Sequence, residues 1–126
     1  MIAAARMGKY RLKSDDFEAS PLVGQFTTRI EADRSIYEVA PAARALVRFA
    51  NLNLLDPWPM QGQFDVIFCR NVVIYFSTET QQRLWPRFAD ALRPGGALMI
   101  GHSERVTGAA LDRLQSDGVT QYQHIS

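Results

Sequence analysis

The sequence predicts an α/β fold that contains a parallel sheet, and two observations support this prediction. Two short apolar runs, residues 64–69 and 97–100, have the composition of strands that are buried on both faces. Between them, from Thr78 onward, apolar residues recur four positions apart, which is the period of an amphipathic helix. A strand, a helix and a second strand in this order predict a right-handed βαβ crossover.

The predicted helix has recognisable ends. Thr78 followed by Gln81 fits a capping box at its start. Residues 93–96, Arg-Pro-Gly-Gly, end it, because glycine can adopt the left-handed cap conformation and proline cannot continue the helical hydrogen bonds. Pro86 lies inside the predicted helix, so either the helix bends there or it begins later than Thr78.

The first forty residues predict a smaller β structure. Residues 2–7 read as the end of a helix that Gly8 terminates, and residues 9–24 as a loop with a short helix near its end. Residues 26–39 hold β-prone pieces around a turn at residues 32–34, which predicts an antiparallel hairpin within a small β subdomain of about residues 26–40. Pro41 then suits the first turn of a short helix through Leu46.

The remainder, residues 47–126, is expected to form the main sheet and its helices. The apolar run of residues 47–55 predicts the first strand of that sheet. Residues 107–118 are polar and partly helical in pattern. Residues 119–125 alternate in polarity and predict an antiparallel edge strand.

Length and composition limit the classes of function. A chain of 126 residues forms one domain with a modest core, and a net charge of +1 argues against a nucleic-acid partner. No stretch reaches the roughly 20 apolar residues that span a bilayer, so we expect no membrane insertion and a cytoplasmic location. The single cysteine, Cys69, is expected to be a buried packing residue and not a reactive thiol.

Candidate ligand-binding residues follow two of the predicted strands, because ligands of open α/β sheets bind beyond the carboxyl ends of the strands. Asn53 and Leu54 form one pair, and Arg70 and Asn71 form the other. For Asn53 alone, a role in a turn and a role in ligand binding are both open. Tyr75 is the candidate for catalysis, since an aromatic face or phenolic oxygen can stabilise a cation; its alternative role is to cap the sheet together with Phe76.

Other polar residues have simpler explanations. His102, Ser103 and Glu104 are adjacent, whereas a catalytic triad needs partners from separated strands, so His102 is expected to form a hydrogen bond at a strand end. His124 and Cys69 do not have the spacing of a metal site, and we expect no metal. Four arginines are expected on solvated faces: Arg44, Arg48, Arg83 and Arg87.

Four short motifs occur in order along the chain. They are FDVIFCRNV at residues 64–72, IYF at residues 74–76, LRPGG at residues 92–96 and GHSE at residues 101–104. In this order and spacing they make the chain resemble the CheR-type chemotaxis receptor methyltransferases, which transfer a methyl group from S-adenosylmethionine (SAM) to glutamate side chains. The likeness extends more loosely upstream, through residues 49–55 and 8–10, and weakens after Gly108.

The resemblance implies a fold and a set of roles. The fold is the C-terminal portion of a Rossmann-like SAM-dependent methyltransferase sheet, with a small β-hairpin subdomain inserted and an antiparallel last strand. The residues that match Asn53 and Leu54 lie by the adenine ring in this family, and those that match Arg70 and Asn71 line the methionine part of the cofactor. Tyr75 matches a tyrosine near the transferred methyl group. The implied product is S-adenosylhomocysteine, and the implied substrate is the cytoplasmic region of a chemoreceptor.

Two features that the family places upstream are absent from this sequence: a glycine-rich cofactor loop after the first strand and an acidic residue that binds the ribose. Residues 1–126 are therefore expected to be a single, N-terminally incomplete domain that has no activity alone. The alternative is a non-catalytic interaction module derived from the same fold. Without its neighbouring strands, the predicted strand near residues 51–55 would expose an edge, which predicts self-association of the chain.

Overall fold

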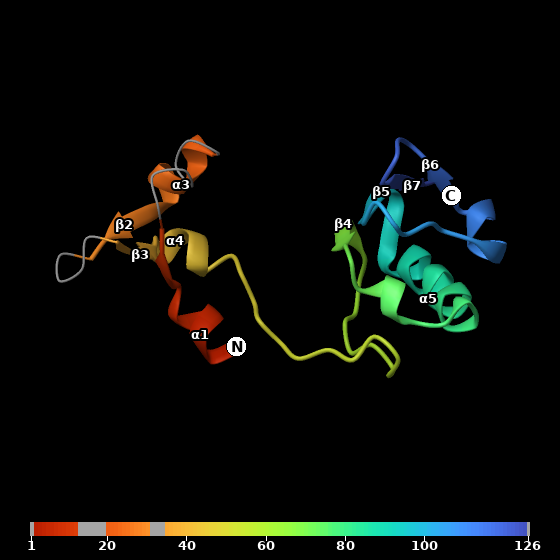
Figure 1. The fold of residues 1–126 in the computed structure, drawn as a ribbon, viewed down its shortest axis with the longest axis horizontal. Coiled ribbons are helices and arrows are strands. Elements are labelled where there is room, and N and C mark those ends of the chain that lie inside the picture. Colours follow the sequence, from red (N-terminus) through yellow and green to blue (C-terminus); the bar gives the residue numbers. More distant parts are fainter. Residues whose placement is uncertain (1, 13–19, 31–34, 126) are drawn as a thin grey trace. The chain divides into compact units, whose positions relative to one another are not determined.

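The computed structural model describes residues 2–12, 20–30 and 35–125, which form two compact units, Met1–Leu52 and Asn53–Ser126 (Figure 1). The first is called unit 1 and the second unit 2, and each is described by itself.

Unit 1 is a small antiparallel sheet with short helices. Its elements are α1 (Ile2–Met7), β1 (Lys9–Arg11), α3 (Pro21–Phe26), β2 (Thr27–Arg29), β3 (Ile36–Val39) and α4 (Pro41–Arg44). The strand order is β1-β3-β2, with Tyr10 opposite Tyr37 on one side and Arg29 opposite Tyr37 on the other. β3 is therefore the central strand, and both of its neighbours run antiparallel to it.

Most of the predicted elements of unit 1 are present. The hairpin strands are confirmed as β2 and β3, while its predicted turn at residues 32–34 lies outside the described residues. Gly8 ends α1 with a φ of 65°, a conformation that glycine adopts without strain. Two predictions were wrong: residues 9–11 form β1 and not a loop, because they pair with β3, and α4 ends at Arg44 instead of Leu46.

Unit 2 contains the βαβ crossover. Its elements are β4 (Phe64–Cys69), the 3-10 turn η1 (Val73–Tyr75), α5 (Thr78–Ala91), β5 (Leu92–Ile100), the 3-10 turn η2 (Gly108–Asp112), β6 (Leu114–Ser116) and β7 (Gln121–His124). The strand order is β4-β5-β7-β6, in which β4 and β5 are parallel and the other pairs are antiparallel. The predicted crossover is confirmed.

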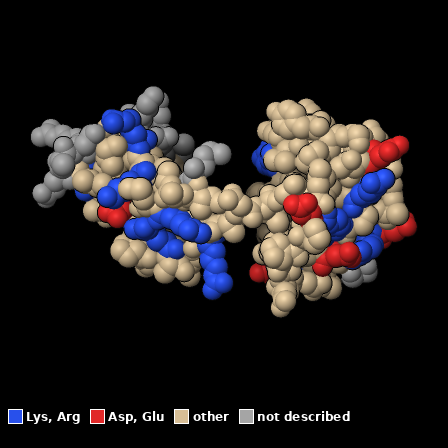
Figure 2. Space-filling model, turned by 90° about the horizontal axis from the view of Figure 1, so that it is seen from below, with Lys and Arg blue, Asp and Glu red and all other residues tan. Residues whose placement is uncertain are grey.

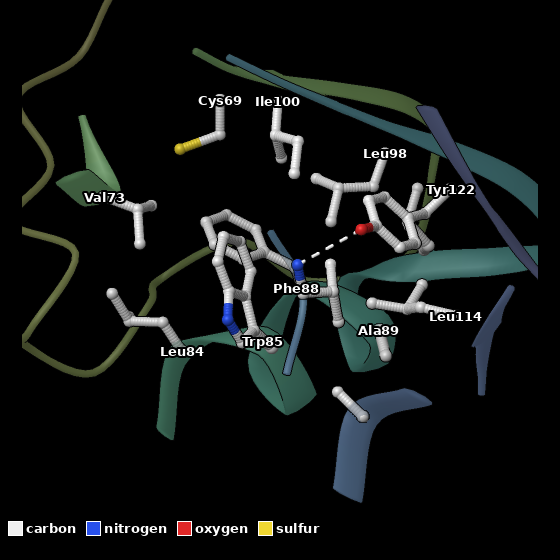
Figure 3. Close-up of a cluster of buried hydrophobic side chains, with 13 residues drawn as sticks. Cys69, Val73, Leu84, Trp85, Phe88, Ala89, Leu98, Ile100, Leu114 and Tyr122 are labelled. Carbon is white, nitrogen blue, oxygen red and sulfur yellow. Dashed lines mark hydrogen bonds between the residues drawn. The ribbon is translucent and has the colours of Figure 1, made fainter. Parts of the chain in front are cut away.

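The core of unit 2 lies between α5 and one face of this sheet (Figure 3). Leu84, Trp85 and Phe88 of α5 point toward the sheet, where they meet side chains such as Leu98 and Ile100. Trp85 is fully buried, and an indole of this size contributes a large apolar area to the core. The Tyr122 hydroxyl oxygen, at the edge of the same cluster, accepts a hydrogen bond from the Val106 amide at 3.3 Å.

The ends of α5 differ slightly from the prediction. The N-cap is Ser77 and not Thr78, because the Ser77 hydroxyl oxygen accepts the Thr80 amide hydrogen at 3.2 Å. The helix begins at Thr78 and continues through Pro86, which excludes the later start.

At the C-terminal end of the helix, Leu92 already pairs with Phe64, so β5 begins at once. The register then shifts, and Ala97 is the next residue that pairs, with Val66. Residues 93–96 are therefore an irregularity within β5.

Three strand predictions need correction. Residues 47–55 form no strand, because no strand lies beside them in the described structure to share their backbone hydrogen bonds. The β4 strand is not buried on both faces, since Phe64, Val66 and Phe68 are exposed on the face away from α5. β7 is an inner strand, because β6 pairs with its outer side. The edge strands of the described sheet are therefore β4 and β6.

Candidate functional site

A buried carboxylate organises the carboxyl ends of β4 and β5. Glu104 is only 3% exposed, and its two oxygens accept four backbone N–H groups. Oε1 accepts from Asn71 at 2.9 Å and from Gly101 at 2.7 Å. Oε2 accepts from Val73 at 2.8 Å and from Ile74 at 3.2 Å. The side chain thus joins the end of β5 to the segment that follows β4.

These four donors explain how an ionised group can be buried. A carboxylate removed from water is strongly destabilising unless hydrogen bonds replace its hydration, and hydrogen bonds to a charged acceptor are the stronger kind. Two of the donors, the amides of Val73 and Ile74, belong to the first turn of η1, whose amide hydrogens have no partner within the turn. Glu104 therefore supplies the acceptor that this short turn requires.

Asn71 adopts an unusual backbone conformation in the same segment. Its φ is 59°, in the left-handed region, and it is the one described non-glycine residue with a positive φ. Asparagine tolerates this region better than most residues, although it is still uncommon. This conformation directs the backbone N–H of Asn71 toward Glu104, while the residue remains exposed.

Gly101 provides the space in which these groups meet. A Cβ atom built on Gly101 would collide with the Asn71 side-chain oxygen and would lie 2.9 Å from Glu104 Oε1. The φ of Gly101 is not in the left-handed region, so the requirement for glycine is one of space. Asn71, Gly101 and Glu104 form a close-packed group, which we call the Glu104 cluster.

A second loop, which carries Asn53 and Leu54, is attached to α5. Arg87 Nη1 donates to the Leu54 carbonyl oxygen at 2.7 Å, and Nη2 donates to the Asp56 carbonyl oxygen. The same guanidinium lies over the Trp58 ring, 4.4 Å from its centroid. Trp58 Nε1 also donates to the Leu54 carbonyl oxygen, at 3.0 Å. Two side chains thus converge on one carbonyl group and fix the loop to the helix.

The predicted turn role of Asn53 is present in the structure. Its side-chain oxygen accepts the Leu55 amide hydrogen at 3.0 Å, and its carbonyl oxygen accepts the Asp56 amide hydrogen at 3.1 Å. Its side-chain NH2 group forms no hydrogen bond with any residue in the described part of the chain, and the residue is exposed. The turn leaves this donor accessible to a ligand.

The structure brings three of the five predicted site residues together. Arg70, Asn71 and Tyr75 lie on the segment that Glu104 holds, beyond the carboxyl end of β4. Asn53 and Leu54 lie on the loop that Arg87 holds. Tyr75 is 81% exposed, so it does not cap the sheet. Phe76 has that structural role instead, because it packs against the core.

Cys69 and His124 have structural roles outside a reactive site. Burial, and secondarily the nearby charge of Glu104, raises the pKa of the Cys69 thiol to about 11. His124 is buried, and its Nδ1 lies 3.1 Å from the Leu92 carbonyl oxygen. Within the described residues, no group of His, Cys, Asp and Glu could hold a metal ion.

The sequence alone does not reveal the two residues that organise the site, Glu104 and Arg87. Glu104 was noted only as a neighbour of His102, and the hydrogen-bonding role expected of His102 belongs to Glu104, since the His102 side chain is exposed. Its one sequence signal was its place in the GHSE motif directly after a strand. Arg87 was assigned to a solvated face, and so was Arg44, which in fact pairs with Glu38 at 3.3 Å.

The comparisons with known proteins agree with this architecture. The model of the CheR methyltransferase, SAM binding domain, matches residues 1–122. The chain belongs to this family. A probable chemotaxis protein methyltransferase of Rhizobium etli is 41% identical over 125 residues, which are 98% of this chain and 47% of the relative. Chemotaxis protein methyltransferase 2 of Pseudomonas aeruginosa is 38% identical over 124 residues, 97% of this chain and 44% of the relative.

These matches confirm the predicted family and its α/β fold class. The chain spans about half the length of the curated relatives it matches. None of the helices in the described residues has the length and apolar character needed to cross a membrane.

Proposed function

We propose that this chain carries part of the SAM site of a protein-glutamate O-methyltransferase that acts on the cytoplasmic region of a chemoreceptor. The observation that supports this best is the Glu104 cluster in a chain of the CheR family. A buried carboxylate fixes the very segment that carries Arg70, Asn71 and Tyr75, and their side chains remain exposed. Preorganised, accessible side chains are what a ligand site requires.

The residues present fit one side of such a cofactor. Leu54 is half-buried, and with the free amide group of Asn53 it can offer an apolar contact and a donor to the adenine ring. Arg70 and Asn71 can bind the carboxylate and amino groups of the methionine part, because a guanidinium and an amide match these groups in charge and hydrogen bonding.

When bound, SAM supplies the methyl group on a positively charged sulfur. Methyl transfer is an in-line displacement, so the protein must align an ionised glutamate of the substrate and stabilise the cation. We assign the second task to Tyr75, whose ring is exposed and can lie against the charged centre. In this proposal the described half-site binds and orients, and the isolated chain is inactive without the remaining part of the site.

Calorimetric titration of S-adenosylhomocysteine into the chain tests the proposed half-site. We expect weak but measurable binding that Asn71→Ala lowers by about tenfold, the effect of losing one or two good hydrogen bonds. Asn51→Ala is the matched control, since Asn51 is also exposed and lies outside the proposed site.

Equal binding by Asn71→Ala and the unsubstituted chain would contradict the assignment of Asn71. No binding into the millimolar range would leave the non-catalytic interaction module as the better description of the isolated chain.

A further inference from the structure

We infer that Glu104 is a positioning residue of the cofactor site, which sets the backbone of residues 71–75 without touching the cofactor. The inference deepens the proposed function and rests on it for the identity of the ligand. At 3% exposure, the Glu104 carboxylate has no surface left for a ligand. Its effect on the site must therefore pass through the backbone that it binds.

Hydrogen bonds within residues 71–76 do little to stabilise the backbone conformation of residues 71–75. Asn71 is in the left-handed region, and η1 is a single turn with two backbone hydrogen bonds, Tyr75 to Val72 at 3.3 Å and Phe76 to Val73 at 3.0 Å. Short 3-10 turns of this kind are marginal without tertiary contacts. The segment nevertheless presents Asn71 and Tyr75 in a defined way, so an external group must hold it.

Glu104 is the group that does so, because one side chain binds three amides of the segment. Oε2 accepts the amide hydrogens of Val73 and Ile74, and Oε1 accepts those of Asn71 and of Gly101, the residue directly after β5. Gly101 directly follows β5, which packs against α5 in the core. The Glu104 carboxylate therefore fixes residues 71–75 relative to the core. The Val73 side chain, in the middle of the segment, is fully buried and adds a contact with the core.

The role requires a carboxylate and not only a polar side chain of the same size. Every one of its four partners is an N–H donor, so both oxygens must be acceptors. Glutamine would direct its NH2 group at backbone N–H groups on one side and leave them without acceptors. Aspartate keeps both oxygens but is one methylene shorter, so it can satisfy only part of the set.

The test compares Glu104→Gln with Glu79→Gln, an exposed glutamate in the first turn of α5. Amide hydrogen exchange followed by NMR is measured for both variants, together with titration of S-adenosylhomocysteine. We expect Glu104→Gln to speed exchange at Asn71, Val73 and Ile74 by about tenfold or more and to weaken binding by a similar factor, with the β5 and β7 amides still protected. Glu104→Asp should recover part of both effects, and Glu79→Gln should change neither.

Unchanged exchange at Asn71, Val73 and Ile74 in Glu104→Gln would overturn the inference. So would faster exchange without weaker binding in a chain that binds the ligand. If the unsubstituted chain binds no S-adenosylhomocysteine, the proposed half-site fails, and the exchange result still decides whether Glu104 holds the segment. If Glu104→Gln does not fold, exchange in the unsubstituted chain decides: protection of the Val73 and Ile74 amides like that of β5 supports the inference, and exchange at the rate of an unstructured peptide contradicts it.

Discussion

The two units of the chain differ in how their side chains are buried. All buried hydrophobic side chains among the described residues belong to unit 2, in one core cluster to which α5, the sheet and the segments beside them contribute. In unit 1, each described residue of β3 is only half-buried, and the apolar residues Leu22 and Phe26 of α3 are exposed. A sheet of three short strands without a buried core is marginal in stability. Unit 2 therefore has the rigid scaffold, and the proposed cofactor residues lie on it.

The two units also differ in how charged side chains are distributed over their surfaces. Figure 2 shows Lys and Arg gathered on the displayed face of unit 1, whereas blue and red residues alternate over unit 2. Oppositely charged groups pair across elements in both units, as Arg44 does with Glu38 in unit 1 and Arg113 does with Asp90, at 2.7 Å, in unit 2. Such exposed pairs contribute little to stability, so the difference in burial is the one that matters.

The largest expected effect comes from equal substitutions in the two units. Leu84→Ala removes a side chain that is 1% exposed, and Leu22→Ala removes one that is 58% exposed. Because both tryptophans, Trp58 and Trp85, lie in unit 2, chemical denaturation is followed by residue-resolved NMR, which reports on each unit separately. We expect Leu84→Ala to lower the free energy of unfolding by about 2–5 kcal/mol and Leu22→Ala to lower it by less than about 0.5 kcal/mol. Similar losses would contradict the contrast in burial.

A smaller effect is expected within unit 2, where Arg87 holds the loop that carries Leu54. Arg87→Ala removes two hydrogen bonds to backbone carbonyl groups and the contact with Trp58. The same denaturation should show a loss of about 1–2 kcal/mol, and the Trp58 emission should change as its ring becomes more exposed. Arg83→Ala, an exposed residue of the same helix, is the control and should have almost no effect.

The burial of Cys69 predicts how unit 2 responds to alkaline pH. Its folded-state pKa is raised to about 11 from an ordinary value of 9.0, so the folded chain retains the thiol proton more strongly than the unfolded chain does. The resulting stabilisation is complete below about pH 9 and is lost as the pH rises through 11. Cys69→Ala should reduce this alkaline decline in denaturation midpoint, and alkylation of Cys69 at pH 8.5 should be much slower in the folded chain than in urea.

These cases show which features could be predicted from the sequence. The β4–α5–β5 crossover was predictable because its signals are local: two apolar runs and the four-residue spacing of Leu84, Phe88 and Leu92. β1 could not be predicted, since a three-residue strand exists only through its pairing with β3. The strand predicted over residues 47–55 was wrong for the opposite reason. These residues have the composition of a strand but lack a partner strand among the described residues.

The same distinction applies to the site. Arg70, Asn71 and Tyr75 were predictable as a group because they are close in sequence beyond one strand. Glu104 lies 33 positions after Asn71, and Arg87 lies 33 positions after Leu54, so no local pattern connects them. The roles of Glu104 and Arg87 depend on which backbone N–H and carbonyl groups the fold places beside them. Neither the periodicity nor the composition of the sequence contains this information.

Residues 51–55, where the exposed edge was predicted, form no strand, so we propose self-association at the β4 edge instead, and there the smallest effect on folding is expected. Phe68 is 70% exposed on this edge strand, and an unpaired strand edge with apolar side chains can pair with a second copy. Phe68→Lys should shift sedimentation at micromolar concentration toward the monomer and change the unfolding free energy by less than about 0.5 kcal/mol. Leu46→Lys, at an apolar residue of unit 1 that is 87% exposed, is the control. A monodisperse monomer in the unsubstituted chain would count against self-association.

The most direct test of the contrast between the units is native-state amide hydrogen exchange of the unsubstituted chain, resolved by residue. We expect the slowest exchange at the amides of β5 and β7, and slow exchange also at Val73 in the segment bound by Glu104. Exchange in β1, β2 and β3 should be faster by about a hundredfold or more. Protection in β3 equal to that in β5 would contradict this expectation, because unit 1 would then be as stable as the scaffold that carries the proposed cofactor residues.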